Sequence, residues 1–586
     1  MEILNYINGE WVKPSVKEYF DVINPATGLV IAKTPLGTKA DVESAAKAAS
    51  EAYTSWRRVP VNDRVQYLFK LRNLMRENGD AIAKLITDEA GKTFEEAKAE
   101  MVRAYENIEV ACGMPHMSKG EFVEDIAPGI DEIMIRQPVG VCATIAPFNF
   151  PGMIPFWYLP YALAAGNTYI VKPSEKVPMT MQFIFKLIEQ VGFPKGVVNM
   201  VNGAKETVDA ILEHPSIRAI TFVGSTNVAK YIYATAAANG KRVQAQGGAK
   251  NPVIILPDAD MEMATKIVAD SAFGCAGQRC LAVSLAVTVA ESKNEFTELI
   301  CDAAASRTVG YGMDSGTQMG PVINTASQQR VEQLIALGAK EGAGVPVDGR
   351  GTVVKGYERG SFVRPTILSD VKAGSEIART ENLWPSICLM HVNTIDDAIQ
   401  LVNSGQYGNQ ASLFTSSGMR RGVSVMKRMR GISALTLVLL HRWRSSRLAD
   451  GRICSLAICT GRVWMRWSFS RRKCCGRTLA QRVTRKLLNF WSKIMVFVDY
   501  EDALIIHYVG WIYSKEQFPT IEQAHQIIDE SKSNFAEHYN RNWLEYRKSV
   551  TESGDWAAVE WGGSGACVQG RAGWTRVFDF SAVTAY

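Results

Sequence analysis

Hydrophobic and polar residues follow two periods in turn along roughly the first 418 residues, and each period predicts one kind of element. Short, β-rich apolar runs predict strands at 141–146, 168–171, 197–201 and 219–223. Helical patterns are interleaved with them, as at 180–191 and 205–213. Strands that alternate with helices indicate βαβ units, so we expect a parallel sheet covered by helices.

A second region with the same alternation runs from about residue 251 to 415. Its predicted strands lie at 253–256, 284–289 and 366–368, and its predicted helices at 262–273 and 395–403. Three earlier helical patterns, which we expect to pack on the first lobe, lie at 39–57, 62–78 and 81–90. The expected fold class is α/β with two parallel lobes.

The regular pattern ends near residue 419. Residues 419–494 crowd Arg, Trp and Cys together without a period, and residues 495–586 show a third texture with one predicted helix at 521–539. We therefore expect four parts, with boundaries at 1–246, 247–418, 419–494 and 495–586, the last an extra C-terminal tail of unknown fold.

Composition excludes several classes of protein. The 586 residues are 47% apolar and 21% charged, which rules out wholesale disorder, collagen and coiled coil. The longest apolar candidate, 432–440, is half the roughly 18 residues that a membrane-spanning helix needs, so no membrane partner is expected. The first residues lack a basic leader pattern, so we predict a cytoplasmic protein with reduced cysteines.

The net charge of +6 hides a break along the chain. Residues 420–486 carry 18 Lys and Arg against one acid, Asp450, a local net charge of +17. The remaining residues hold 47 Lys and Arg against 58 acids, a net charge of −11. The basic character therefore belongs to one block.

Cys280 is the strongest candidate for covalent chemistry. It ends the sequence Cys275-Ala276-Gly277-Gln278-Arg279-Cys280, where small residues allow a substrate carbonyl to approach closely. A thiol becomes a nucleophile once its thiolate is stabilised. The alternative interpretation, a buried cysteine that packs as a small hydrophobe, is the better one for Cys275 and the other scattered thiols.

Three predicted strand ends carry residues that suit an oxyanion and a cofactor. Asn149 offers a side-chain amide as an oxyanion donor. Lys172 and Glu175 supply a cation and a carboxylate suited to ribose hydroxyls. Gly224 and Ser225 lie between a strand and a helix, where free N–H groups can bind a pyrophosphate. Each signal is weak alone, but their order and spacing together with Cys280 make a strong one.

These residues together resemble the aldehyde dehydrogenase superfamily over about residues 5–418. Further matching pieces lie at 23–28, 320–323, 365–367 and 407–409. The resemblance implies an NAD-binding domain at 1–246 with an oligomerisation arm near 118–140, and a catalytic domain at 247–418. The dinucleotide fingerprint G-x-G-x-x-G, which that family lacks, is absent here too.

The resemblance also implies the roles of single residues. Cys280 is the expected nucleophile, and Asn149 is the expected oxyanion donor together with the backbone N–H of Cys280. NAD is the expected cofactor, and the residues expected to line it are Phe148, Lys172, Glu175, Gly224, Ser225 and Glu381.

One departure from the family sequence indicates which molecule accepts the acyl group. Most members carry a Glu just before a Gly-Gly-Lys element, and here Gln246 takes that place. An amide cannot accept a proton as general base, so water would be poorly activated to hydrolyse a thioester. A thiol acceptor needs less help, because its pKa of roughly 8 to 9 leaves some thiolate at neutral pH. We infer acyl transfer to coenzyme A as the cosubstrate.

The sequence around these motifs is similar to the CoA-acylating, methylmalonate-semialdehyde branch of the family. The substrate of that branch carries a carboxylate, which calls for cations near the thiol. By resemblance, Arg279 and Arg103 are the expected substrate-binding residues. The alternative for Arg103 is a solvated position on a helix.

The expected reaction is the NAD-dependent oxidation of methylmalonate or malonate semialdehyde. The resemblance implies decarboxylation and transfer of the acyl group from Cys280 to CoA, which gives propionyl-CoA or acetyl-CoA. The alternatives are a hydrolytic aldehyde dehydrogenase and a catalytically impaired remnant. The expected partners are the small semialdehyde, CoA and further copies of the chain in a homodimer or homotetramer.

Three interpretations compete for the basic block. Its Arg and Trp residues could bind nucleic acid, but this interpretation is not favoured. Its four cysteines do not have the paired C-x2-C spacing of zinc sites, so no metal is expected. The third interpretation is translation in a shifted reading frame.

The genetic code favours the shifted frame. Codons that encode residues 450–460, read two bases later, can give Trp-Lys-Asp-Leu-Phe-Ala-Gly-Asp-Leu-His, which resembles the C-terminal part of the branch. Codons for residues 468–473, shifted in the same way, can give Phe-Phe-Thr-Gln-Lys, like its terminal segment. A second, shorter departure from the family sequence lies at 380–385. One extra base in the codons explains it and leaves Glu381 in place. The tail at 495–586 is then a neighbouring reading frame joined in error or a fused domain.

Overall fold

The protein is described by a computed structural model that covers residues 2–14, 16–127, 130–381 and 383–417, together with short strands between residues 432 and 576. The chain divides into two units, residues 1–472 and 473–586. In the second unit, the described strands are β20 (Ala558–Gly562), β21 (Gly565–Gly570) and β22 (Gly573–Arg576), which form an antiparallel sheet.

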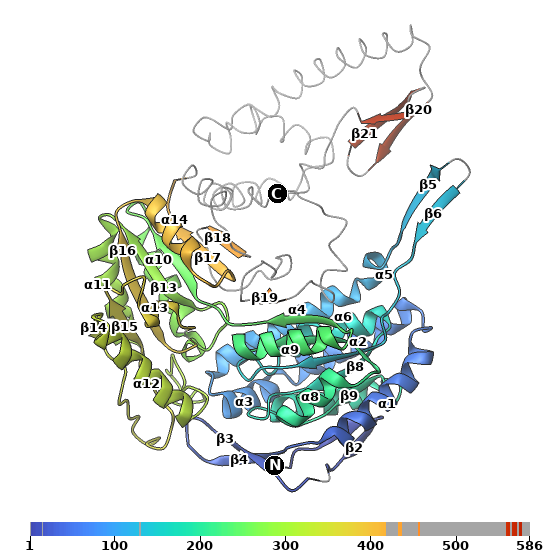
Figure 1. The fold of residues 1–586 in the computed structure, drawn as a ribbon, viewed down its shortest axis with the longest axis horizontal. Helices are drawn as coiled ribbons and strands as arrows, with labels where there is room; N and C mark the ends of the chain where they lie inside the picture. Colours follow the sequence, from blue (N-terminus) through green and yellow to red (C-terminus); the bar gives the residue numbers. More distant parts are fainter. Residues whose placement is uncertain are drawn as a thin grey trace, which may run out of the picture. The chain divides into compact units, whose positions relative to one another are not determined.

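The first sheet of the larger unit has the strand order β19-β11-β10-β7-β8-β9-β1-β2 (Figure 1). Its inner strands are parallel: β7 (Val141–Ile145), β8 (Thr168–Lys172), β9 (Val198–Met200), β10 (Ile217–Val223) and β11 (Arg242–Gln246). Its edges are short antiparallel strands: β1 (Asn5–Ile7), β2 (Glu10–Val12) and β19 (Ser455–Leu456).

The chain reverses its direction across this sheet next to β7. From β7 it moves outward to β8 and β9, and it then returns to the other side of β7 for β10 and β11. Ligands of open α/β sheets bind at such a switch point, beyond the carboxyl ends of the strands. Asn149, Lys172 and Gly224 all lie at these ends.

Helices cover both faces of the first sheet. One face carries α1 (Lys39–Trp56), α8 (Lys205–Glu213) and α9 (Thr226–Ala238). The other carries α2 (Val61–Glu77), α3 (Gly79–Ala90), α4 (Phe94–Cys112), α6 (Leu159–Ala165) and α7 (Met179–Val191). The side chains of β7 alternate between the two cores: Val141, Ala143 and Ile145 belong to the first core, and Cys142 belongs to the second.

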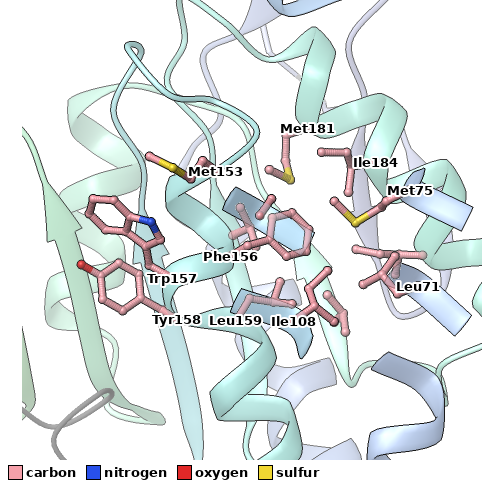
Figure 2. Close-up of a cluster of buried hydrophobic side chains, with 14 of the residues drawn as sticks. Leu71, Met75, Ile108, Met153, Phe156, Trp157, Tyr158, Leu159, Met181 and Ile184 are labelled. Carbon is pink, nitrogen blue, oxygen red and sulfur yellow. The ribbon is translucent and has the colours of Figure 1, made fainter. Parts of the chain in front are cut away.

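Figure 2 shows part of the second of these cores. Phe156, in the 3-10 turn Ile154–Trp157, is fully buried together with Ile108 of α4 and Ile184 of α7. Met153 belongs to the same cluster, so the loop that follows β7 is anchored in this core. The packing fixes where Asn149, just upstream of Met153, can lie.

The second sheet has the order β14-β15-β16-β13-β12-β17-β18. Its strands are β12 (Asn251–Ile255), β13 (Val283–Val289), β14 (Gly344–Val347), β15 (Thr366–Ser369), β16 (Ser386–Val392), β17 (Gln410–Phe414) and β18 (Ile432–Leu435), and β14 alone pairs antiparallel. The helices of this lobe are α10 (Met261–Phe273), α11 (Ser292–Ala305), α12 (Thr325–Lys340), α13 (Glu376–Arg379) and α14 (Ile395–Ser404).

Five smaller elements lie outside the two large sheets and their covering helices. β3 (Tyr19–Ile23) pairs with β4 (Val30–Pro35), and the short α5 (Met114–Met117) follows α4. β5 (Glu121–Ala127) and β6 (Ile130–Met134) form a hairpin that extends from the lobe (Figure 1). Phe122 and Ile133 on this hairpin are 60% and 67% exposed.

The structure confirms the α/β fold and the predicted parallel strands and helices, with ends that differ by one or two residues. The antiparallel edge strands of the first sheet were not predicted, because two or three residues carry no readable period. The predicted helix at 521–539 lies outside the described residues, as does nearly all of the basic block. Within the described part of the chain, no helix combines the length and the apolarity that crossing a membrane requires.

Candidate active site

Cys280 lies on a tight turn between α10 and β13. Cys275, Ala276 and Gly277 in this turn have successive φ angles of 52°, 50° and 68°, all left-handed. Gly277 is required, because a Cβ there would lie 2.2 Å from the Trp384 carbonyl oxygen. Two non-glycine residues in this region are strained, and such strain persists where surrounding contacts dictate the backbone.

Two amide side chains hold the backbone of Cys280 itself. The Nδ2 atoms of Asn251 and Asn409 donate to the Cys280 carbonyl oxygen at 2.8 Å and 2.9 Å. Asn251 begins β12 and Asn409 immediately precedes β17, so both come from the second sheet. The half-buried thiol is therefore fixed on a rigid support rather than on a free loop.

Asn149 reaches this turn from the first lobe. It is buried, and its Nδ2 donates to the Gln278 carbonyl oxygen at 3.0 Å, two residues before Cys280. The Gln278 side chain accepts in turn from the Ile323 backbone N–H at 3.0 Å. The structure thus brings together the predicted nucleophile and the predicted oxyanion donor, which are 131 residues apart in the sequence.

The surroundings of the Cys280 thiol keep it protonated near neutral pH. Burial raises its pKa to about 11, its own backbone N–H lowers it, and the Glu381 carboxylate raises it further. The cations Lys92 and Arg279 lower the pKa of the same thiol. Because only the thiolate is nucleophilic, the backbone N–H and these two cations are the groups that favour activation of Cys280.

A partly buried ion pair marks the carboxyl end of β8. Lys172 Nζ lies 3.1 Å from Glu175 Oε2, and Lys172 is 3% exposed. Burial lowers the pKa of Lys172, and Glu175 opposes this shift. Burial disfavours the ionised form of Glu175, but the charge and hydrogen bond of Lys172, a backbone N–H and the charge of Lys176 together hold the pKa of Glu175 below its usual range.

Helix α9 begins directly after Gly224 and Ser225. Ser225 is the N-cap, and among the described residues its side chain makes no capping hydrogen bond, so the first turn keeps free N–H groups. The Gly224 N–H donates to the Gln246 carbonyl oxygen at 3.0 Å. Phe148, one residue before Asn149, has the Lys176 ammonium 5.3 Å from its ring centroid.

Glu381 closes the site from the second lobe. Its Oε1 accepts from the Ala249 N–H at 3.0 Å, and a Cβ at Gly248 would lie 2.4 Å from its Oε2. Burial raises the pKa of Glu381 to about 7, while the Ala249 N–H and the cations Arg330 and Lys250 lower it. Gln246, two residues before Gly248, is 8% exposed and presents an amide at the end of β11.

The two predicted substrate arginines differ in their surroundings. Arg279 lies among protein groups: its Nε is 3.3 Å from Cys275 Sγ, and its guanidinium contacts Glu96 and the Asp270 carbonyl oxygen. Arg103, on α4, pairs with Glu106 at 2.6 Å, and its buried Nε has no hydrogen-bond partner among the described residues. Arg103 therefore keeps a donor unused, whereas Arg279 is engaged.

Sequence reasoning missed three charged residues near the site. Lys92 Nζ lies 2.5 Å from Glu100 Oε2, and Glu96 Oε1 accepts from the Cys275 N–H at 2.6 Å. The only sequence signal was the Thr93-x-x-Glu96 pattern of a capping box, which marks a helix start and not a site.

A cavity of about 460 Å³ lies elsewhere in the first lobe, beside α2, α5 and α6. None of the candidate site residues lines it, so it is separate from the chemistry around Cys280.

Comparison with known proteins places this arrangement in a class. Residues 11–431 match the model of the aldehyde dehydrogenase family. A Dictyostelium discoideum protein described as a probable methylmalonate-semialdehyde/malonate-semialdehyde dehydrogenase [acylating], mitochondrial, is 44% identical over 70% of this chain and 78% of its own length. Malonate-semialdehyde dehydrogenase 2 of Geobacillus kaustophilus is 42% identical over 71% of this chain and 85% of its own length.

Solved structures agree with the sequence matches. A putative methylmalonate-semialdehyde dehydrogenase from Sinorhizobium meliloti, complexed with NAD, superposes with a TM-score of 0.77 at 36% identity, over 78% of this chain and 94% of that one. Methylmalonate-semialdehyde dehydrogenase from Oceanimonas doudoroffii gives 0.76 at 37% identity over the same shares. The chain belongs to the aldehyde dehydrogenase family. Several similar proteins are named as semialdehyde dehydrogenases.

Proposed function

We propose that this chain is an NAD-dependent, CoA-acylating dehydrogenase of methylmalonate or malonate semialdehyde. The observation that carries the proposal is the junction of Asn149 and the Cys280 turn, with an amide, Gln246, in place of a carboxylate. The names of the relatives support the same substrate class.

The cofactor proposal rests on the carboxyl ends of the first sheet. The uncapped first turn of α9, with Gly224 and Ser225, suits a pyrophosphate, and the buried pair of Lys172 and Glu175 suits ribose hydroxyls. Phe148 and Glu381 would line the rest of the site. NAD bound there would accept the hydride.

In the proposed mechanism, the Cys280 thiolate adds to the aldehyde carbon. The amide of Asn149 and the backbone N–H of Cys280 stabilise the resulting oxyanion, while Arg103 and Arg279 are the proposed contacts for the substrate carboxylate. Loss of hydride leaves a thioester on Cys280. The bond between the α-carbon and the β-carboxylate then breaks, CO2 leaves, and the α-carbon takes up a proton, which gives a propionyl or acetyl thioester.

The last step is transfer to CoA. Its thiolate attacks the thioester carbonyl, and the Cys280 thiolate leaves as the bond breaks. Gln246 cannot accept a proton from water, so hydrolysis lacks a base at this position. A hydrolytic aldehyde dehydrogenase is the second candidate, and a catalytically impaired remnant is the third.

The experiment supplies the purified chain with each semialdehyde, NAD and CoA, and follows NADH absorbance together with acyl-CoA by mass spectrometry. We expect acyl-CoA that depends on CoA and disappears in Cys280→Ala. Cys301→Ala, at another half-buried thiol, is the matched control and should keep the activity. Equal production of free acid without CoA would contradict acyl transfer and favour the hydrolytic enzyme.

The hairpin of β5 and β6 supports a proposed homo-oligomer, a dimer or a tetramer. Ile135, just past the hairpin, is 71% exposed, and the exposed apolar residues of the hairpin gain from being covered. The cytoplasmic location stays a prediction, since the Dictyostelium discoideum relative named above is described as mitochondrial.

A further inference from the structure

Three charged side chains lie on one face of α4. Glu96, Glu100 and Arg103 are spaced four and three residues apart, which aligns them along a helix. Glu96 reaches the turn of Cys280 and Glu100 reaches the loop of Asn149, although these two segments belong to different lobes. A single helix face therefore touches both halves of the site.

Glu100 holds the loop that carries Asn149. Its side chain is completely buried, and its Oε1 accepts from the Gly152 and Met153 N–H groups at 2.8 Å and 3.0 Å. A Cβ at Gly152 would lie 2.5 Å from Met101 Sδ, so the loop packs closely against α4 at this contact. A buried carboxylate is stable only when it is paired and hydrogen-bonded, and here both conditions hold.

Glu96 holds the turn of Cys280 in the same way. Besides the Cys275 N–H, its Oε1 lies 3.5 Å from the Arg279 guanidinium, and its Oε2 accepts from the Thr93 N–H at 3.0 Å. This one carboxylate therefore joins the start of α4 to the strained backbone that leads to Cys280. The contact fixes the turn relative to the helix.

Lys92 completes the set from just before the helix. Its ammonium contacts Glu100 and lies 3.5 Å from the centroid of the Phe150 ring, next to Asn149. Gly312 packs closely against its backbone, since a Cβ there would lie 2.1 Å from the Lys92 carbonyl oxygen.

We propose that Lys92, Glu96 and Glu100 are positioning residues that hold the Asn149 loop and the Cys280 turn against one face of α4, and so set the reactivity of the Cys280 thiol. The proposal rests on the proposed role of Cys280. The charged groups that act on the thiol are Lys92 and Arg279, which favour the thiolate, and Glu381, which opposes it.

The test measures how fast iodoacetamide alkylates Cys280 across a range of pH, with the site identified by peptide mass mapping. Lys92→Met alone would leave the Glu100 carboxylate buried without its cation, and this variant can fail to fold. The double variant Lys92→Met/Glu100→Gln removes both charges, keeps an acceptor for the loop N–H groups and preserves side-chain size.

Lys98→Met is the matched control. Lys98 lies on α4, pairs with Asp80 at 3.3 Å and has its ammonium 5.2 Å from the centroid of the Phe94 ring, but it is well exposed to solvent. The Lys98→Met variant therefore also loses an ion pair and a contact between a cation and a ring, but outside the candidate site. Lys92→Arg keeps the charge and is the conservative rescue.

In the double variant, we expect the alkylation midpoint to move to higher pH and the rate at pH 8 to fall several-fold, because each unit of thiol pKa changes the thiolate fraction about tenfold. Lys98→Met should match the wild type, and Lys92→Arg should stay near it. An unchanged midpoint in a folded double variant would overturn the proposal. Alkylation needs no semialdehyde, NAD or CoA, so failure of the proposed function would show separately, as absent turnover with a normal alkylation profile.

Discussion

Buried carboxylates that bind backbone N–H groups recur in the first lobe. Glu89, at the end of α3, accepts from the Met179 and Thr180 N–H groups at 2.7 Å and 2.9 Å, and so caps α7 from another helix. Glu100 does the same for the Asn149 loop. The two carboxyl groups differ in how their burial is compensated. Glu100 pairs with the Lys92 cation, whereas burial raises the pKa of Glu89 to about 8.

The raised pKa of Glu89 predicts a dependence of stability on pH. Its folded pKa lies above the ordinary value of 4.5, so its stabilising contribution is complete below about pH 4.5 and is lost as the pH rises to about 8. Over this window, the native state binds more protons at Glu89 than the unfolded state does. Wild-type protein should lose about 5 kcal/mol of unfolding free energy between these limits because of Glu89, and Glu89→Gln should not show this loss.

Urea denaturation at several pH values measures this effect. Glu341→Gln is the control, since Glu341 accepts from the Glu376 and Ile377 N–H groups of α13 in a less buried place. A pH slope that is the same in Glu89→Gln and in wild type would show that Glu89 is not its source.

Gln246 provides a second prediction for a single residue. In Gln246→Glu, a carboxylate replaces the amide at the end of β11 and could accept a proton from water. We expect free acid to form without CoA, at a rate well above that of the wild type. Gln246→Asn keeps an amide and should not gain this activity, as product analysis by mass spectrometry will show. A variant with the new carboxylate that still needs CoA would argue against the role given to this position.

Among the elements, α4 joins the core of the first lobe to the candidate site. Its apolar residues, such as Ile108, pack into the cluster of Figure 2, while Glu96 and Glu100 contact the site loops. The capping box of Thr93 and Glu96 fixes where the helix begins. One face of α4 packs in the core and another contacts the site loops. Loss of the core packing should therefore loosen these loops.

Ile108→Ala tests the packing of α4. Ile108 is fully buried, so its truncation should lower the unfolding free energy by about 2 to 5 kcal/mol. Val102→Ala, at a position on the same helix that is 46% exposed, should change it by less than about 1 kcal/mol. Chemical denaturation compares the two, and equal losses would refute the assignment of Ile108 to the core.

On the scale of the whole molecule, the similarity to the family covers only part of the chain. The family model matches residues 11–431, and the Dictyostelium discoideum and Geobacillus kaustophilus relatives have 22% and 15% of their lengths outside the sequence match. The match stops just inside the basic block, where the genetic code favours a shifted frame. We propose that the lost segment contributed to the substrate mouth and to oligomer contacts.

Replacement of residues 420–486 by the reframed sequence tests this proposal. We expect NAD- and CoA-dependent oxidation of methylmalonate semialdehyde to rise, because the restored segment would complete the substrate mouth and the oligomer. Gel filtration alongside the assay separates the two effects. Equal activity before and after the change would refute the frameshift account.

The sequence alone determined most of the fold and the identity of the chemical groups. The alternation of β-rich runs and helical patterns predicted the parallel strands of both sheets, because side-chain period follows directly from backbone geometry. The run around Cys280, the strand-end residues and Gln246 indicated the reaction class, since the chemistry of each group is local.

Only the tertiary structure decided which groups meet. Asn149 lies against the turn of Cys280 because two sheets far apart in sequence face each other there. Arg279 contacts Glu96 and Cys275, and the sequence alone could not show these contacts. Lys92 and Glu100 could not be recognised beforehand, because a lysine and a glutamate on or near a helix are usually solvated, and burial alone makes this pair part of the site.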